Sequence, residues 1–161
     1  MALSFKRHSN IYTLESVVEM PISVSKAWVF FSSPANLAKI TPPEMDFLIT
    51  SGKPKPVYTG QIISYKVSII KGIRINWVSE ITCVDFEKYF VDEQRFGPYK
   101  MWHHEHIFEK IDDNNCKIID KVSYKLPFGL IGRWSHNLLI KKQLQTIFDY
   151  RTKIIKKLFL M

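Results

Sequence analysis

The first clear pattern in the chain is an alternation of period two over residues 11–20. One parity of this stretch carries Tyr12, Leu14, Ser16, Val18 and Met20. Successive side chains of a β-strand point to opposite faces, and the stretch is rich in β-branched residues. We therefore expect a first strand that turns these five side chains inward and ends at Pro21.

Two short helices are predicted after this strand. Ser23 or Ser25 can cap the first helix, which runs over residues 26–31, and Pro34 suits the first turn of the second, which runs over residues 36–40. The prolines that follow Thr41 end the second helix, because a residue before proline avoids the helical conformation.

From residue 45 the pattern changes to β-strands separated by turns. The expected strands span residues 46–51, 60–70, 74–85, 89–96, 101–111 and 117–126. Consecutive strands joined by short turns form an antiparallel meander. Pro127, Gly129 and Gly132 break the series after its last strand.

The remainder, from about Trp134, is predicted to be one long helix. One face of it, at steps of three and four, carries Ile140, Leu144, Ile147, Phe148, Arg151, Ile154, Ile155 and Leu158. About 25 residues at 1.5 Å each give roughly 38 Å, enough to cross a sheet. The inner face of the sheet needs a cover, so we expect the helix to pack there, although a helix on a membrane surface has a similar pattern.

Length and composition indicate one folded domain over residues 1–161, with a core and room for a modest cavity. No apolar run approaches the roughly 18 residues of a membrane span, and the N-terminus lacks the apolar stretch of a secretory signal. We expect a soluble, cytoplasmic protein. Cys83 and Cys116 lie in separate predicted strands, without the spacing of a zinc site or a disulfide framework.

The formal charge of +8 raises nucleic acid or an anionic membrane surface as a partner. The basic residues cluster near the C-terminus, at Lys141, Lys142, Lys153, Lys156 and Lys157. No nucleic-acid recognition motif accompanies them, so we expect a solvated face and no specific nucleic-acid partner. A partner-binding module that uses this basic helix remains an alternative, and the oligomeric state stays open.

The candidate chemistry lies in the hairpin from Met101 to Leu126. Turn-forming residues at 112–115 join its strands, and an odd loop would pair Phe108 with Asp120, His106 with Val122, His104 with Tyr124 and Trp102 with Leu126. One inner wall then carries Trp102, His104, His106, Phe108, Asp120, Val122 and Tyr124. His103 falls on the opposite, outer face.

Three interpretations fit a carboxylate, two imidazoles and a phenol on an apolar wall. Buried, these groups need partners, so they form a satisfied core network, the wall of a ligand cavity, or an acid–base pair drawn from His104, His106 and Asp120. Catalysis is the least expected, since no nucleophile has a recognisable context. His104 and His106 can chelate a metal, but nothing places Asp120 or Glu80 as further ligands, so no metal and no cofactor is predicted.

The order of elements resembles the SRPBCC superfamily, the helix-grip fold of START-like, pollen-allergen-like and polyketide cyclase/dehydrase-like proteins. The segments Gly97-Pro98-Tyr99, Trp102-x-His104-x-His106-x-Phe108, Asp120-x-Val122-x-Tyr124 and Pro127-x-Gly129 are similar to small bacterial members, some of them described as cell-division-inhibitor-like. The resemblance implies an α+β fold. A curved antiparallel sheet of six to seven strands would wrap around the long C-terminal helix, with two short helices after the first strand.

The resemblance also implies a cavity between sheet and helix. Carried over by position, its wall includes Trp102, His104, His106, Asp120 and Tyr124, with Phe148 and Arg151 from the helix. The mouth would lie at the short helices and the turn at 52–57, near Trp28, Leu37 and Ile40. The implied function is binding, transport or sequestration of a hydrophobic or amphipathic small molecule or lipid. The alternative is a cyclase- or dehydratase-type enzyme, since catalytic relatives use cavity polar groups as acids or bases.

Overall fold

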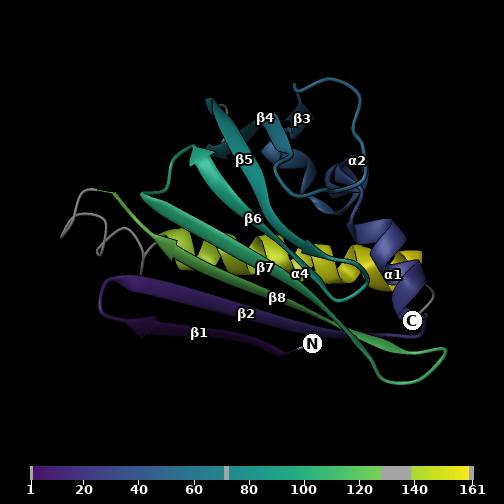
Figure 1. Cartoon of the computed structure of the whole chain (residues 1–161). Coiled ribbons are helices and arrows are strands. Elements are labelled where there is room, and N and C mark those ends of the chain that lie inside the picture. Colours follow the sequence, from purple (N-terminus) through teal and green to yellow (C-terminus); the bar gives the residue numbers. More distant parts are fainter. Residues whose placement is uncertain (1, 71–72, 128–138, 160–161) are drawn as a thin grey trace.

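A computed structural model describes residues 2–70, 73–127 and 139–159. Within these ranges eight antiparallel strands form one sheet, in the order β1-β2-β8-β7-β6-β5-β4-β3 (Figure 1). The strands are β1 (Ala2–His8), β2 (Ile11–Met20), β3 (Leu48–Ile49), β4 (Ile62–Ile70), β5 (Ile73–Asp85), β6 (Tyr89–Phe96), β7 (Met101–Lys110) and β8 (Cys116–Lys125). The α+β meander expected from the sequence is confirmed.

The prediction of six to seven strands was wrong by one, because the sequence pattern did not reveal β1. This edge strand pairs with β2 alone, through a two-residue turn in which Ser9 has φ 55°. Most of its side chains are exposed, and Lys6, Arg7 and His8 interrupt its alternation. β2 itself follows the prediction, since all five side chains of its inward parity are buried.

The two short helices lie where the sequence predicted them. Helix α1 (Val24–Phe31) starts at Ser23, whose hydroxyl accepts a hydrogen bond of 3.4 Å from the backbone N–H of Lys26. Helix α2 (Pro34–Leu37) has Pro34 in its first turn and continues into the 3₁₀ turn η1 (Ala38–Ile40). A second 3₁₀ turn, η2 (Pro43–Met45), leads to β3.

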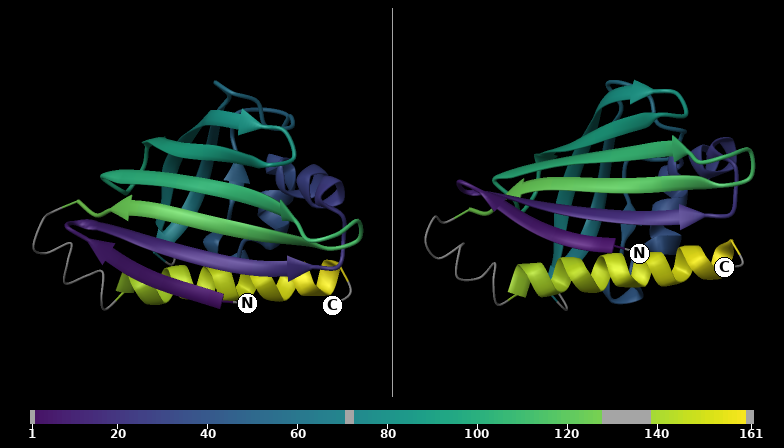
Figure 2. Two further views of the ribbon diagram at one scale, coloured as in Figure 1. Left: turned by 60° about the horizontal axis from the view of Figure 1, so that its bottom comes forward. Right: turned by 90° about the horizontal axis from the view of Figure 1, so that it is seen from below.

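Helix α4 (Lys141–Leu158) lies along the inner face of the sheet, as both views in Figure 2 show. It buries Leu144, Phe148, Arg151, Thr152 and Ile155. Leu158, predicted on the packed face, is 48% exposed because it sits in the last turn, past the buried Ile155. The predicted helix start near Trp134 and the breakers Gly129 and Gly132 lie outside the described residues.

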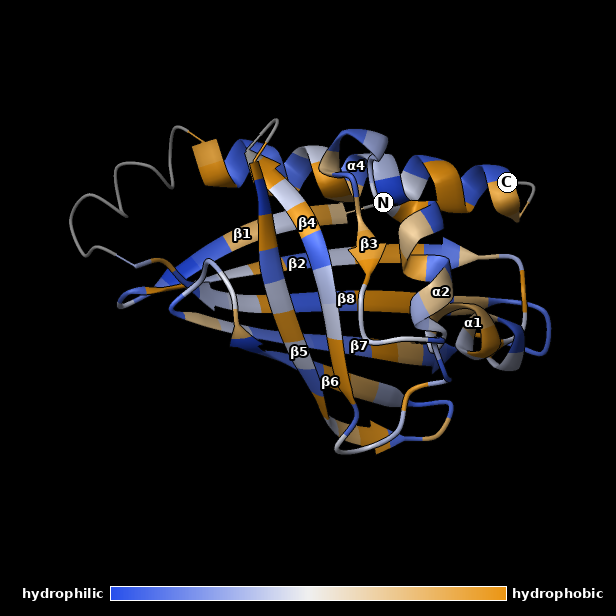
Figure 3. Ribbon diagram, turned by 90° about the horizontal axis from the view of Figure 1, so that it is seen from above, coloured by the Kyte–Doolittle hydropathy of each residue, from blue (hydrophilic) through white to orange (hydrophobic). Residues whose placement is uncertain are grey.

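The sheet is strongly curved at β5. Its pairing with β6 shifts register between Val78 and Ser79 and again between Ile81 and Cys83. Such bulges bend a strand and increase its twist. Seen from above, β4 and β5 therefore run at a steep angle to β2 and β8 (Figure 3).

In the β7–β8 hairpin the observed register differs from the predicted one by two residues of β8 relative to β7. His106 lies opposite Asp120, His104 opposite Val122 and Trp102 opposite Tyr124. The loop closes one residue earlier than expected, because the backbone N–H of Ile111 donates to the Asn115 carbonyl at 3.0 Å. The carboxylate of Asp112 holds this loop by accepting from the backbone N–H of Asn114 at 2.8 Å and from the Asn115 amide at 2.9 Å. Because the relative shift is two residues, every side chain stays on its predicted face.

Candidate functional site

The core consists of two apolar clusters with a band of buried ionisable side chains between them. In three neighbouring elements an ionisable group separates side chains of the two clusters: Ile118, Asp120 and Val122 in β8; Phe108, His106, His104 and Trp102 in β7; Ile155, Arg151 and Phe148 in α4. Alternation of strands and helical spacing bring these positions to one level of the fold. The polar band is therefore an internal layer of the core.

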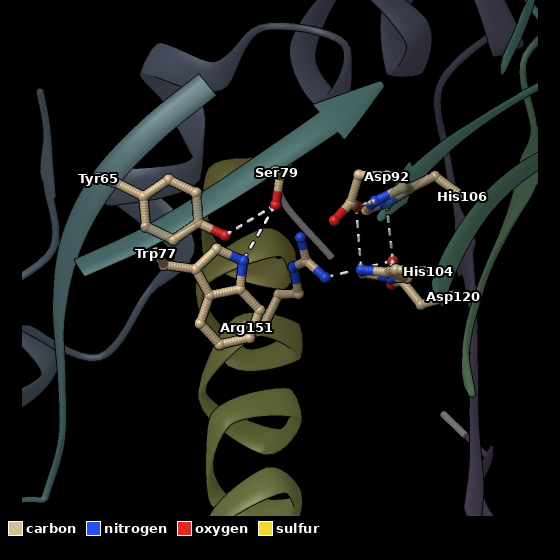
Figure 4. Close-up of polar contacts among 8 residues, drawn as sticks. All are labelled: Tyr65, Trp77, Ser79, Asp92, His104, His106, Asp120 and Arg151. Atoms are coloured by element: carbon tan, nitrogen blue, oxygen red, sulfur yellow. Dashed lines mark hydrogen bonds and ion pairs between the residues drawn. The ribbon is translucent and has the colours of Figure 1, made fainter. Parts of the chain in front are cut away.

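This layer contains the buried ionic cluster, which we define as Asp92, His104, His106, Asp120 and Arg151 (Figure 4). The Nε2 and Nδ1 atoms of His104 lie 3.0 Å from Asp120 Oδ1 and 3.4 Å from Asp92 Oδ2. The Nε2 and Nδ1 atoms of His106 lie 2.7 Å from Asp92 Oδ2 and 3.2 Å from Asp120 Oδ1. Each imidazole thus spans the two carboxylates, and the ring centroids are 3.7 Å apart.

Arg151 reaches the cluster from α4, and its Nη1 donates to Asp120 Oδ1 at 3.2 Å. With both carboxylates and Arg151 charged, the cluster has one net negative charge when both imidazoles are neutral. Buried charges are costly unless they are balanced and hydrogen-bonded. A single additional positive charge therefore neutralises the cluster.

The two histidines respond differently to this environment. Burial lowers the pKa of His104, with a further contribution from the neighbouring His106. Burial alone would also lower the pKa of His106, but its hydrogen bonds to Asp120 and Asp92 outweigh burial and raise it. When the cluster takes up one proton, the proton therefore goes to His106 and not to His104.

The carboxylates are held in their ionised form. Burial would raise the pKa of Asp120, but the charge of Arg151 and the hydrogen bonds from both histidines hold it well below its usual value. The pKa of Asp92 is lowered in spite of burial, first by the hydrogen bond from His106. Both residues are therefore anionic throughout the neutral range.

A cavity of about 200 Å³ lies between the sheet, the α2–η1 region and α4. Its wall is mainly apolar, with side chains such as Phe31, Ile63, Val67, Ile81 and Ile147. Four of the five residues of the buried ionic cluster, Asp92, His104, His106 and Arg151, also line this wall. An apolar chamber with a polar group on one side is the usual form of a small-molecule site.

A second polar group on the wall involves Tyr65, Trp77 and Ser79 (Figure 4). The indole N–H of Trp77 donates to Ser79 Oγ at 3.0 Å, and the Tyr65 hydroxyl lies 3.3 Å from the same oxygen. Burial raises the pKa of Tyr65 well above its ordinary value. This phenol is therefore a neutral hydrogen-bonding group.

The structure places seven of the ten expected ligand-binding residues on the cavity wall: Leu37, Ile40, Trp102, His104, His106, Phe148 and Arg151. The other three do not line it. Trp28 packs edge-on against Phe108 in the apolar core, with ring centroids 5.2 Å apart. Asp120 lies behind the two histidines, and Tyr124 stacks on Tyr12 at 5.6 Å.

Asp92 is the site residue that sequence reasoning missed. It lies opposite His104 in the β6–β7 pairing, across the Gly97-Pro98 turn. The predicted strand ends, 96 and 101, would have placed Asp92 opposite Glu105, so the sequence alone did not reveal this contact. Glu80, weighed as a metal ligand, points away from the cluster and pairs with Arg95 at 2.6 Å. His103 lies on the outer face, 2.8 Å from Glu93.

Comparison with known proteins gives no matching family model and no matching curated sequence. Solved structures do match. A START superfamily protein from Mycobacterium smegmatis has a TM-score of 0.68 at 10% identity and covers 91% of this chain and 96% of its own. The Zhui aromatase/cyclase from Streptomyces sp. R1128 has a TM-score of 0.67 at 12% identity, over 92% and 96% of the two chains. Norcoclaurine synthase from Thalictrum flavum has a TM-score of 0.63 at 14% identity, over 91% and 87%.

The chain has the SRPBCC, or START-like, helix-grip fold. The resemblance expected from the sequence is thereby confirmed at the level of the fold. SRPBCC folds among these neighbours include both a START protein and enzymes, so the fold is compatible with ligand binding and with cyclase-like chemistry. In the described part of this chain, no helix is long and apolar enough to cross a membrane.

Proposed function

We propose that this protein binds a hydrophobic or amphipathic small molecule in the cavity between the sheet and α4. The observation that carries the proposal is a cavity of about 200 Å³ whose mainly apolar wall includes a cluster of ionisable side chains, Asp92, His104, His106 and Arg151. A cavity of about 150 Å³ accommodates benzene, and drug-sized sites begin at about 300 Å³. The size suits a small aromatic or short aliphatic molecule.

Affinity and orientation have separate sources in this site. Burying apolar ligand surface contributes about 25 cal/mol per Å², and the phenylalanine, isoleucine and valine side chains of the wall provide the matching surface. Asp92, His104 and Arg151 offer hydrogen-bonding atoms along one side of the wall, where a polar end of the ligand would lie. This arrangement favours a molecule with one apolar and one polar end.

Native mass spectrometry of freshly purified protein tests for a co-purified small molecule. Titration with small aromatic probes such as indole and naphthol then measures binding through the fluorescence of Trp77 and Trp102, which line the cavity. Ile63→Trp fills the chamber and is expected to weaken binding at least tenfold. Ile62→Trp is the matched control, because the neighbouring Ile62 is 53% exposed. Equal binding by both variants, or no binding by the wild type, contradicts the proposal.

Acid–base catalysis on a bound ligand is the second candidate, favoured by the histidines of opposite pKa shift at the cavity wall. A neutral His104 accepts a proton and a protonated His106 donates one. Once a ligand is known, His104→Gln separates the two functions. A loss of turnover with unchanged affinity supports catalysis, and unchanged ligand in both proteins supports binding alone.

A further inference from the structure

We infer that Asp92, His104 and His106 form a binding site for a divalent first-row transition-metal ion at the wall of the cavity. One ligand atom from each residue lies within 4.8 Å of the other two. The strand pairing creates this group, because Asp92 lies opposite His104, and His106 follows two residues later on the same face. Two imidazoles and one carboxylate are a common set of ligands for such ions.

Asp120 prepares the histidines for this role. Its Oδ1 lies 3.0 Å from Nε2 of His104 and 3.2 Å from Nδ1 of His106, so it accepts a hydrogen bond from each ring. The other ring nitrogens, Nδ1 of His104 and Nε2 of His106, then face Asp92. In the free protein Nε2 of His106 is hydrogen-bonded to Asp92 at 2.7 Å, and a bound metal ion would take the place of the proton in that hydrogen bond. A carboxylate that accepts the second N–H of a ligating histidine is a regular feature of metal sites.

These two nitrogens point to the same carboxylate oxygen. Nδ1 of His104 lies 3.4 Å and Nε2 of His106 lies 2.7 Å from Asp92 Oδ2. Ligand atoms about 2.1 Å from a tetrahedral zinc ion are about 3.4 Å apart, so the first distance already fits and the second must open by about 0.7 Å. A small rotation of the Asp92 side chain, which is 17% exposed, provides this movement.

The charge of the cluster also suits a cation. Arg151 lies against Asp120 at 3.2 Å and balances that carboxylate, so Asp92 provides the net negative charge when both imidazoles are neutral. When both imidazoles are neutral, the charge of Asp120 is balanced by Arg151 and the charge of Asp92 is not balanced. The Asp92 side of the cluster faces the cavity, because Asp92, His104 and His106 line it and Asp120 does not.

Three protein ligands leave coordination positions open, as in catalytic metal sites. These positions would face the chamber, where an oxygen atom of a bound molecule, such as a carboxylate, phenolate or carbonyl, could complete the coordination. The nitrogen ligands favour Zn²⁺, Co²⁺ or Fe²⁺ over Mg²⁺ and Ca²⁺. The inference does not depend on the proposed small-molecule binding, since metal affinity is measured without any organic ligand.

The test is titration of chelator-treated protein with Co²⁺, followed by visible absorption, and with Zn²⁺, followed by calorimetry. One equivalent is expected to bind to the wild type, and Asp92→Asn is expected to bind at least tenfold more weakly. Glu93→Gln is the matched control, because Glu93 is the next residue of β6 and contacts His103, 2.8 Å away, on the outer face. Its affinity should equal that of the wild type.

Histidine NMR keeps the inference testable if Asp92→Asn does not fold. In the wild type, Zn²⁺ should shift the ring resonances of His104 and His106 and leave those of His103 unchanged. The inference is overturned if the wild type takes up no stoichiometric metal ion, if Glu93→Gln weakens binding as much as Asp92→Asn, or if the His103 resonances respond in place of the other two.

Discussion

Oxygen Oδ1 of Asp120 has three partners within 3.2 Å, one from each of His104, His106 and Arg151. The side chain is 7% exposed, so water does not replace a partner that is lost. Removing one member of a buried ion pair is costly because the remaining charge is left uncompensated. Asp120 is therefore the residue on which the stability of the cluster depends most.

We expect Asp120→Asn to lower the free energy of unfolding by about 3 kcal/mol, because Arg151 then lacks its carboxylate. Urea denaturation followed by tryptophan fluorescence measures this change. Glu105→Gln is the control, since Glu105 pairs with Lys121 at 2.9 Å on the outer face and such partly exposed pairs contribute about 1 kcal/mol or less. Equal decreases in the free energy of unfolding of the two variants would contradict the prediction that the buried cluster contributes more to stability than a partly exposed ion pair.

At this scale the sequence predicted which side chains face inward better than which ones touch. Alternation placed Trp102, His104, His106 and Asp120 on the inner face, and the structure agrees. The predicted partners across the hairpin were wrong by two residues. Alternation could not detect this, because a relative shift of two residues keeps every side chain on its face. The loop contacts of Asp112 and Asn115 help to fix the register, and the alternation of side chains does not reveal them.

Helix α4 packs against the sheet and also contributes Arg151 to the ionic cluster. Leu144 and Phe148 pack in one apolar cluster and Ile155 in the other, while Arg151 between them reaches Asp120. A helix that contributes to both clusters and to the ionic layer cannot rotate without disturbing all three. The position of α4 on the sheet is therefore set by the same residues that build the site.

We predict that Leu144→Ala lowers the free energy of unfolding by about 3 kcal/mol, since Leu144 is 3% exposed and its removal leaves a cavity. Leu158→Ala makes the same change on the same helix at a position that is 48% exposed, and should cost about 0.5 kcal/mol or less. Thermal or urea unfolding of both variants measures the difference. A similar loss at Leu158 would mean that the end of the helix packs more tightly than described.

Elements were predictable where burial imposed a strong period and less so at edges. β8, in the interior of the sheet, alternates perfectly between buried and partly exposed positions. β1 is a sheet edge with mostly exposed side chains, so its sequence has no strong pattern and its strand form depends on pairing with β2. Asp92 was missed for a similar reason, because its position beside His104 depends on the pairing of β6 with β7.

The two outer surfaces of the molecule differ in charge. On the outer face of the sheet, acidic and basic residues pair across strands, as in Glu105 with Lys121 and Glu109 with Lys117. The outer side of α4 has exposed Lys141, Lys142, Lys153, Lys156 and Lys157, with Asp149 among them. These five lysines and Asp149 give the outer side of α4 a net charge of +4, half of the +8 of the whole chain.

We predict that Lys153→Glu with Lys156→Glu elutes from a heparin column at lower salt than the wild type, because the helix side provides the positive field. Lys53→Glu with Lys55→Glu is the matched control, since both lysines are exposed and the charge change is equal. The control should elute at higher salt than the helix variant. Identical elution would assign retention to net charge and count against a basic docking face.

For the molecule as a whole, the order of elements was sufficient to predict the helix-grip fold. The bend of the sheet was not predictable, because it depends on register shifts at Val78, Ser79 and Ile81 that have no mark in the sequence. The residues at the mouth depended on this bend. Trp28 was expected beside the opening and lies instead against Phe90 and Phe108.

The ionic layer has a consequence for how the chain selects its native state during folding. A hairpin in which β8 is shifted by two residues relative to β7 still buries every apolar side chain. Hydrophobic burial alone therefore does not distinguish it from the native pairing. In the slipped hairpin Asp120 would face Phe108 instead of His106 and would lose its imidazole partners. The ionic layer therefore favours the native register of the hairpin, which the apolar parts of the core do not distinguish from the slipped one.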